Sequence, residues 1–395
     1  MTSPPSWPSW HRPARATSTP RRSASTEAPS QRDDPKGHLP TELAMKLVTG
    51  RSDVLATLQR LRAAGTALFS PNGELAAEIE GLLIGAQRFA DRHGLAEVPI
   101  AIGMTGIYPD NAQFRKISTS CVTRTDLGGF DGGDVREGCE IWLRTLAVYD
   151  SLAGADGRPR FPAVRILPFI DHGWATDPED AAMLHDPSVV ERMAIIMHDA
   201  SKLEEAENIR LTAAYVARFG DQVVVEGAAD KIYDPADIAR LKLSRDDQLS
   251  TPGAVEAFVR STGVDLVVPN LGTEHRSVGA GRAERRYERE LARLIRDRVG
   301  PIMALHGTSC LEGRVGDTAA DGICKVNFYT AMAVGAGQKL YRILREREAD
   351  VIDGNNLWIN SESFGHDVRR RHVADVCGGM LEALGYARLA EESRS

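Results

Sequence analysis

Residues 164–173 of this 395-residue chain read VRILPFIDHG. The run Val164–Ile170 is apolar at most positions rather than at alternate ones, which is typical of a parallel strand buried on both faces. The apolar run ends at Asp171-His172-Gly173, where ionisable side chains and a glycine replace it. The stretch therefore predicts a buried parallel strand that carries an Asp-His pair at its carboxyl end.

Seven similar apolar runs alternate along the chain with longer segments of helical periodicity. The runs are Thr66–Phe69, Val98–Met104, Ala194–Met197, Val223–Val225, Asp265–Pro269, Ile302–Leu305 and Ile323–Val326. Helices are expected at 43–62, 74–93, 137–152, 204–219, 252–262, 282–299 and 331–348. This alternation predicts an α/β fold, a (β/α)8 TIM barrel, or less often an open doubly wound sheet. Because neither GxGxxG nor a Walker-type GxxxxGK follows a strand, dinucleotide and P-loop sites are not expected.

The first 40 residues differ in kind from the rest of the chain. They are rich in Pro, Ser, Thr and Arg and contain few aliphatic residues. Such a segment cannot bury enough apolar surface to offset the entropy of ordering it, so we expect a disordered tail. An Arg- and Ser-rich transit peptide is the alternative. Residues 41–395 are expected to form one single TIM-barrel domain.

The composition of the chain limits the kinds of partner and the cellular compartment that we expect. The formal net charge is −7, with basic residues scattered along the chain, which argues against nucleic acid or a membrane surface as the main partner. No apolar run reaches the roughly 18 residues that a membrane-spanning helix needs. Five cysteines show no CxxC pair and no regular spacing, as expected for free thiols in a reducing cytosol. We therefore expect a cytoplasmic protein.

Three histidines occupy equivalent positions. His172 follows the third strand, His275 the sixth and His306 the seventh. In a barrel the carboxyl ends of all strands open on one rim, so residues distant in sequence converge there. A single histidine at such a place is more often an isolated polar residue, but three together predict a catalytic divalent-metal site. His198, at the end of the fourth strand, either supplies a fourth ligand or supports the ligands without binding the ion.

Carboxylates lie beside these histidines. Asp171 precedes a predicted ligand by one residue and can move a proton without binding the ion; the alternative is that it only orients its neighbours. Asp199 and Glu226 close the fourth and fifth strands. Both should face the same rim, where they could support the metal, a second cation or a ligand histidine.

The ends of the last two strands indicate an anion site. HGTS (residues 306–309) and NFYT (327–330) supply a glycine, hydroxyl groups and backbone N–H groups. The loops after strands seven and eight are the usual phosphate-binding corner of this fold. A Gly-Thr-Ser turn is common, so its position after strand seven carries the prediction.

These segments resemble the class II, metal-dependent ketose-bisphosphate aldolases, the family of fructose- and tagatose-bisphosphate aldolases. The resemblance covers roughly residues 66–385 and is strongest at 166–330. IDHG (170–173) resembles the family's LDHG segment, and TGVDLVVPNLGTEH (262–275) resembles its TGVD…IGT.HG segment. ALHGTS (304–309) resembles LHGGS, and GICKVNFYT (322–330) resembles the KVNIDT segment.

The resemblance implies a metal-dependent aldolase that cleaves or forms a C–C bond through the enediolate of dihydroxyacetone phosphate. The substrate would be a phosphorylated sugar, Zn²⁺ the expected ion, and a homodimer or higher homo-oligomer the expected assembly. The implied ligands are His172, His275 and His306, and Asp171 is the implied acid/base. Further implied roles are enediolate contact for Asn327, phosphate binding for Gly307, Ser309 and Thr330, and support of the metal region for Asp199 and Glu226.

The chain also departs from the family pattern. Arg276 replaces a glycine, Ala228 replaces a glutamate, and Ala229–Asp237 replaces a Gly-Gly-x-Glu-Asp loop that carries an acid. A Gly-rich insertion occupies 126–134, and Cys310 stands where small residues are usual. We therefore expect the metal and phosphate corners to be kept, with the wall facing the acceptor rebuilt. Arg276 either binds an anionic acceptor group there or points away from the pocket.

Two other functions fit the same residues. A metal-dependent phosphosugar epimerase or lyase would use Asp171 and a metal ion equally well. A non-catalytic phosphosugar-binding protein is the third reading. The presence of Asp171 beside the histidines argues against it, because binding alone needs no acid/base.

Overall fold

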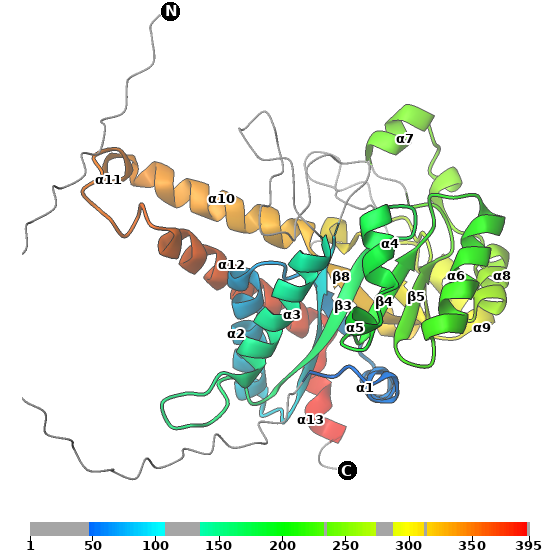
Figure 1. Cartoon of the computed structure of the whole chain (residues 1–395), viewed down its shortest axis with the longest axis horizontal. Helices are drawn as coiled ribbons and strands as arrows, with labels where there is room; N and C mark the ends of the chain where they lie inside the picture. Colours follow the sequence, from blue (N-terminus) through cyan, green and yellow to red (C-terminus); the bar gives the residue numbers. More distant parts are fainter. Residues whose placement is uncertain (1–46, 107–134, 233–234, 274–286, 312–313, 393–395) are drawn as a thin grey trace, which may run out of the picture. The chain divides into compact units, whose positions relative to one another are not determined.

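The computed structural model describes residues 47–106, 135–232, 235–273, 287–311 and 314–392. Eight parallel strands close into a barrel in sequence order, with helices between them (Figure 1). The predicted (β/α)8 barrel is confirmed, and the open doubly wound sheet is excluded. The predicted N-terminal tail lies outside the described residues.

All eight strands overlap the apolar runs from which they were predicted. Their side chains are buried at nearly every position, as the continuous apolar runs require when one face lines the barrel interior and the other meets the helices. The strands are β1 Leu68–Pro71, β2 Val98–Met104, β3 Val164–Trp174, β4 Ile195–Asp199, β5 Val224–Ala228, β6 Leu266–Val268, β7 Met303–Leu305 and β8 Ile323–Phe328.

Each predicted helix overlaps an observed one. The helices are α1 Arg51–Ala63, α2 Ala76–His93, α3 Val135–Ser151, α4 Pro178–Leu184, α5 Pro187–Val190, α6 Glu205–Phe219, α7 Pro235–Leu241, α8 Pro252–Thr262, α9 Arg289–Val299, α10 Thr330–Glu346, α11 Glu348–Ile352, α12 Glu362–Leu384 and α13 Leu389–Glu392. The short helices α4, α5 and α7 were not predicted. Figure 1 shows α6, α8 and α9 outside β4 and β5. The first helix begins later than expected, at Arg51 rather than residue 43.

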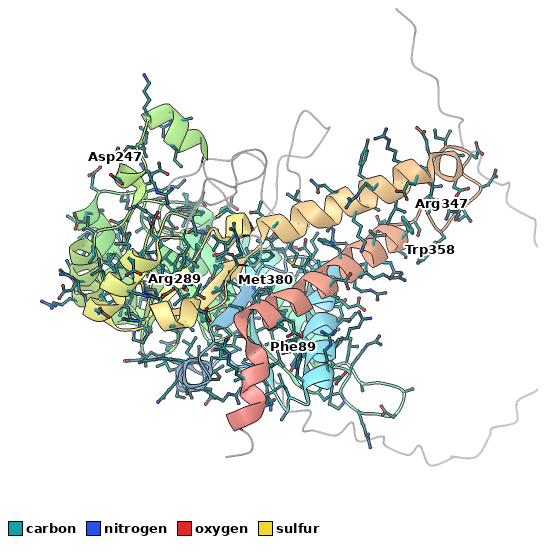
Figure 2. All side chains as sticks on the ribbon, turned by 180° about the vertical axis from the view of Figure 1, so that it is seen from behind. Phe89, Asp247, Arg289, Arg347, Trp358 and Met380 are labelled. Atoms are coloured by element: carbon teal, nitrogen blue, oxygen red, sulfur yellow. The ribbon has the colours of Figure 1, made fainter. Side chains whose placement is uncertain are left out.

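The long helix α12 was not predicted. It packs against α2 at close range: a Cβ added at Gly85 of α2 would lie 2.6 Å from the carbonyl oxygen of Ala374 of α12. Met380 and Phe89 are buried in the region of this contact (Figure 2). Helix α10 also packs on α12, so these two long helices form a pair beside the barrel.

Candidate active site

A compact cluster of ionisable side chains lies where β3 and β7 end. Asp171 and His172 belong to the last residues of β3, and His306 directly follows β7. All three are buried, and one ligand atom from each lies within 4.8 Å of those of the other two. The structure therefore brings together Asp171 and two of the three predicted metal ligands.

Two successive residues of β3 face this cluster, although successive side chains of a regular strand point to opposite faces. The pairing of β3 with β4 shifts register between Ile170 and Gly173, and His172 adopts a φ of 53°, in the left-handed region. Residues other than glycine rarely adopt this backbone conformation outside turns and functional sites. The local irregularity lets Asp171 and His172 serve one site.

A buried carboxylate contacts each histidine of the cluster on the ring nitrogen that points away from Asp171. The imidazole Nδ1 of His172 lies 2.7 Å from Asp199 Oδ2, and Nε2 of His306 lies 2.8 Å from Glu226 Oε1. These contacts turn Nε2 of His172 and Nδ1 of His306 toward Asp171 Oδ1, at 3.9 and 3.7 Å. Metal-binding histidines usually have such a carboxylate on the other ring nitrogen. This donor set fits a divalent ion of the zinc type.

The surroundings of His306 and Asp199 shift the pKa values of these two groups. Burial lowers the pKa of His306 well below its usual value, and the nearby Asp171 carboxylate opposes this only in part. Burial alone would raise the pKa of Asp199, but the hydrogen bonds from His172 and Ser201 outweigh it and leave that pKa lowered. A neutral imidazole and an ionised carboxylate are the forms that metal binding requires.

Asp171 is held by two amides. Asn327 of β8 donates from Nδ2 to Asp171 Oδ1 at 2.9 Å, and Asn72 donates from Nδ2 to Asp171 Oδ2 at 2.9 Å. The two N–H donors hold one oxygen each and so fix the orientation of the carboxyl group in the site. Asn327 was predicted as a site residue, but Asn72 was not, because Ser70-Pro71-Asn72-Gly73 is also typical of an ordinary turn.

Two further side chains were missed by the sequence analysis. Trp174, the last residue of β3, stacks on His172 with ring centroids 5.4 Å apart. Lys325 on β8 is fully buried, with Nζ 2.9 Å from Glu226 Oε2. The KVN segment was the available signal for Lys325, since a lysine two residues before Asn327 shares its face of the strand.

The predicted phosphate corner forms a turn at the start of α10. Gly307 has a φ of 66°, which favours glycine. Ser309 Oγ accepts a hydrogen bond from Ala331 N at 3.0 Å, and Thr330 is the first residue of α10. Cys310 is buried in the same turn, with Sγ 3.1 Å from the Gly307 carbonyl oxygen. The amino end of a helix favours anions through its N–H groups and dipole.

The remaining predicted residues fall into two groups. His275, Arg276 and the insertion at 126–134 lie outside the described residues. His198 points to the helix layer, where it stacks on Tyr215 of α6 with ring centroids 4.5 Å apart. The alternative that His198 is a fourth ligand is not supported, because alternation along β4 sends His198 outward and Asp199 inward.

Residues 229–237 follow β5 and were expected to replace an acid-bearing loop of the resembled family. Side-chain hydrogen bonds hold the first residues of this segment. Ser250 Oγ donates a hydrogen bond to Asp230 Oδ2, and Asn270 Nδ2 donates to the carbonyl oxygen of Lys231 at 2.8 Å. Burial raises the pKa of Asp230, although the Ser250 hydroxyl opposes this. The start of this loop is thus bonded to Ser250, which precedes α8, and to Asn270, which follows β6.

Three solved structures with a similar fold carry the name aldolase in their descriptions. The chain is similar to the YdjI aldolase from Escherichia coli K12, at 18% identity and a TM-score of 0.52, covering 83% of this chain and 95% of that one. For a putative fructose-1,6-bisphosphate aldolase from Coccidioides immitis the values are 20%, 0.55, 86% and 98%. For fructose-bisphosphate aldolase from Campylobacter jejuni they are 15%, 0.59, 86% and 97%. Identities this low show the fold alone.

Sequence comparison identifies the family. No curated protein sequence matches the chain. Among the residues that the structure describes, no helix has the length and apolar character to span a membrane. The family model described as fructose-bisphosphate aldolase class-II matches residues 153–386, more than half of the chain and the part that holds the clustered site. The chain therefore belongs to the class II fructose-bisphosphate aldolase family, as a divergent member.

Proposed function

We propose that this protein is a metal-dependent aldolase that cleaves or forms a C–C bond of a phosphorylated ketose through the enediolate of dihydroxyacetone phosphate. The observation that carries the proposal is the position of Asp171. Its Oδ1 lies 3.9 Å from His172 Nε2 and 3.7 Å from His306 Nδ1. A carboxylate beside two inward-facing imidazole nitrogens can exchange a proton with a substrate held at a metal ion.

The ion would be held by His172, His306 and His275, with Zn²⁺ as the proposed metal. When bound, it would supply Lewis-acid polarisation of the ketose carbonyl. Asp199 and Glu226 fix the orientation of His172 and His306 through contacts of 2.7 and 2.8 Å. Burial of both carboxylates strengthens these contacts by excluding water.

Asp171 would move the proton. In cleavage it takes the proton from the C4 hydroxyl, the C3–C4 bond breaks, and its electron pair passes into the ketose carbonyl. The products are an aldehyde and the enediolate of dihydroxyacetone phosphate. Asn327 Nδ2 lies 2.9 Å from Asp171 Oδ1, and it would donate a hydrogen bond to the enediolate oxygen. In synthesis the same groups act in reverse.

The phosphate would bind at the turn of Gly307 and Ser309 and at Thr330, next to the amino end of α10. Support comes from the left-handed glycine and from the position of Thr330 at the start of a 17-residue helix. Arg276 is proposed to contact an anionic group of the acceptor, because it replaces a glycine in the segment after β6.

The test is an assay for triose-phosphate release from a panel of ketose phosphates and bisphosphates. The protein would be assayed as purified, after chelation, and after reloading with Zn²⁺. Release of dihydroxyacetone phosphate that is lost on chelation and restored by the metal supports the proposal. Interconversion of epimers without release would instead identify an epimerase, and binding without any turnover would identify a phosphosugar-binding protein.

Three further expectations from the sequence remain proposals, and of these only the oligomeric state rests on the resemblance. These are one catalytic domain over residues 41–395, assembly as a homodimer or higher homo-oligomer, and a cytoplasmic location. Sedimentation of the full chain beside a chain lacking residues 1–40 tests the first two together, because a self-contained domain should keep both its assembly and its activity.

A further inference from the structure

Lys325 is a buried charge to which the chemistry above gives no role. Its side chain on β8 is fully buried, and its Nζ lies 3.7 Å from the centroid of the Phe169 ring on β3. Lysine is almost never fully buried unless it is paired, since removing an ammonium group from water is costly. Glu226 pairs with it at 2.9 Å. An ion pair offsets the cost of the charge but does not explain its presence, because apolar residues can often replace a buried pair.

A third contact of Lys325 reaches the site. Lys325 and Asn327 lie two residues apart on β8, so both side chains face the barrel interior. Lys325 Nζ donates a hydrogen bond to Asn327 Oδ1 at 2.5 Å. An ammonium group can only donate, and an amide accepts only through its oxygen. The contact therefore fixes which end of the Asn327 amide faces Lys325.

The other end of that amide faces the reacting groups. Asn327 Nδ2 lies 2.9 Å from Asp171 Oδ1 and 3.4 Å from His306 Nδ1. If the amide rotated by half a turn, its oxygen would face the Asp171 carboxylate, and two acceptors would repel each other. The rotated amide would also face the ammonium group of Lys325 with its own N–H donors.

We propose that Lys325 is a positioning residue, which holds the Asn327 amide with Nδ2 toward Asp171 and His306. The inference rests on the proposed aldolase function. Lys325 also contacts Glu226, which holds His306. The same ammonium group thus connects the histidine and the amide that flank Asp171, and its removal should disturb the amide first, because Asn327 has a donor end and an acceptor end to exchange.

The test is a double-mutant cycle of Lys325→Met and Asn327→Ala, scored by kcat and KM for triose-phosphate release by the zinc-loaded enzyme. Lys325→Met should lower kcat by about 10- to 100-fold, the scale of a misplaced group, and leave KM within about threefold of wild type. In the Asn327→Ala background, the same change should lower kcat by less than about threefold, because the amide on which Lys325 acts is gone.

The controls separate this role from a structural one. Lys339→Met, on α10 and partly exposed, should leave kcat unchanged. If Lys325→Met is insoluble, Lys325→Gln replaces it, because a neutral amide can present either end to Asn327. An equal drop in kcat with and without Asn327, or wild-type kcat in Lys325→Met, overturns the proposal.

A second measurement does not depend on turnover and applies if the wild type releases no triose phosphate. That lack of release would count against the proposed function alone. The urea midpoint of the metal-free chain should then fall less on Lys325→Met when Asn327 is already alanine. Additive shifts would overturn the positioning role by themselves. Zinc content per chain should stay near wild type in Lys325→Met, and a loss of zinc would show that Lys325 acts through Glu226 and His306 instead.

Discussion

The Asp199 carboxylate lies 2.7 Å from Nδ1 of His172, and both groups are buried at adjacent strand ends. The contact fixes the tautomer and ring orientation of His172, so that Nε2 faces Asp171. Asp199 is therefore expected to govern metal affinity although it is not one of the proposed ligands.

Asp199→Asn should weaken zinc binding by about 10- to 100-fold, the usual effect of losing such a partner. Competition with a chromophoric chelator measures the affinity. Asp321→Asn is the matched control, because Asp321 is also a buried carboxylate but is paired with Arg289 and Arg293 and, among the residues that the structure describes, with none of the site. The control should lose stability but not zinc affinity, and equal affinities for Asp199→Asn and wild type would remove the orienting role.

His275→Ala should lose the metal as His172→Ala and His306→Ala do, because a site with three protein ligands seldom survives the loss of one. The stoichiometry of zinc per chain, measured by mass spectrometry, decides this. His198→Ala should keep the metal, since His198 packs against α6. Full zinc content in His275→Ala would exclude that residue as a ligand.

Gly85→Ala should destabilise the fold by about 1–3 kcal/mol, the cost of overpacking a close contact. The added methyl group would lie 2.6 Å from the backbone oxygen of Ala374 and 2.7 Å from Cβ of Cys377. Gly378→Ala on α12 meets nothing within 4 Å and should stabilise by about 0.5–1 kcal/mol through helix propensity. Urea unfolding of both variants measures the difference, and equal shifts would contradict the close packing of α2 on α12.

The structure also predicts a pH dependence of stability from His198. Burial lowers the pKa of His198 from its ordinary value of 6.5 to about 4. The unfolded chain therefore takes up a proton near pH 6.5 that the folded chain does not. Stability contributed by the neutral ring is complete above pH 6.5 and falls by about 1.4 kcal/mol per pH unit toward pH 4.

His198→Asn should remove this slope, because an amide can replace the contact of Nδ1 with Thr212 Oγ1 without titrating. Urea unfolding of both proteins between pH 7 and 4 gives the slope as a difference, in which the other titrating groups cancel. Parallel curves would show that His198 does not titrate in this range.

The barrel could be predicted because its signals are local. Strands buried on both faces are apolar throughout, and they stand out from the helices around them. Helix α8 was predicted to the residue, because Thr251 caps its amino end, Pro252 occupies its first turn and Gly263 ends it with a φ of 71°.

Helix α12 escaped prediction because apolar residues make only part of its contact with α2, although Val373, Cys377 and Met380 are buried along it. Small residues and backbone meet at Gly81 and Gly85. Arginines of α12 pair with glutamates of α2, Arg369 with Glu78 at 3.3 Å and Arg370 with Glu80 at 2.8 Å. A pattern built on charge pairs and glycines carries little hydrophobic periodicity.

The residues of the site also fall into those that local sequence signals could predict and those that they could not. Asp171, His172 and His306 could be placed on one rim, because their positions at strand ends follow from topology. The two amides at Asp171 and the ammonium group of Lys325 depend on which way side chains turn inside the barrel. That direction is set by register, by the irregular end of β3 and by contacts between residues as distant as Asn72 and Asp171.

The central claim is that Asp171 moves a proton and does not bind the ion. The most direct measurement is turnover and zinc content of Asp171→Asn in the same preparation. The account predicts full zinc occupancy and about 10²- to 10⁴-fold lower kcat for triose-phosphate release, the usual contribution of a positioned acid/base. A modest loss of stability is also expected, because the NH2 group of the new amide at position 171 would face another donor, the Nδ2 of Asn72 or of Asn327. Wild-type turnover in Asp171→Asn, or loss of the metal with loss of the carboxylate, would contradict the account.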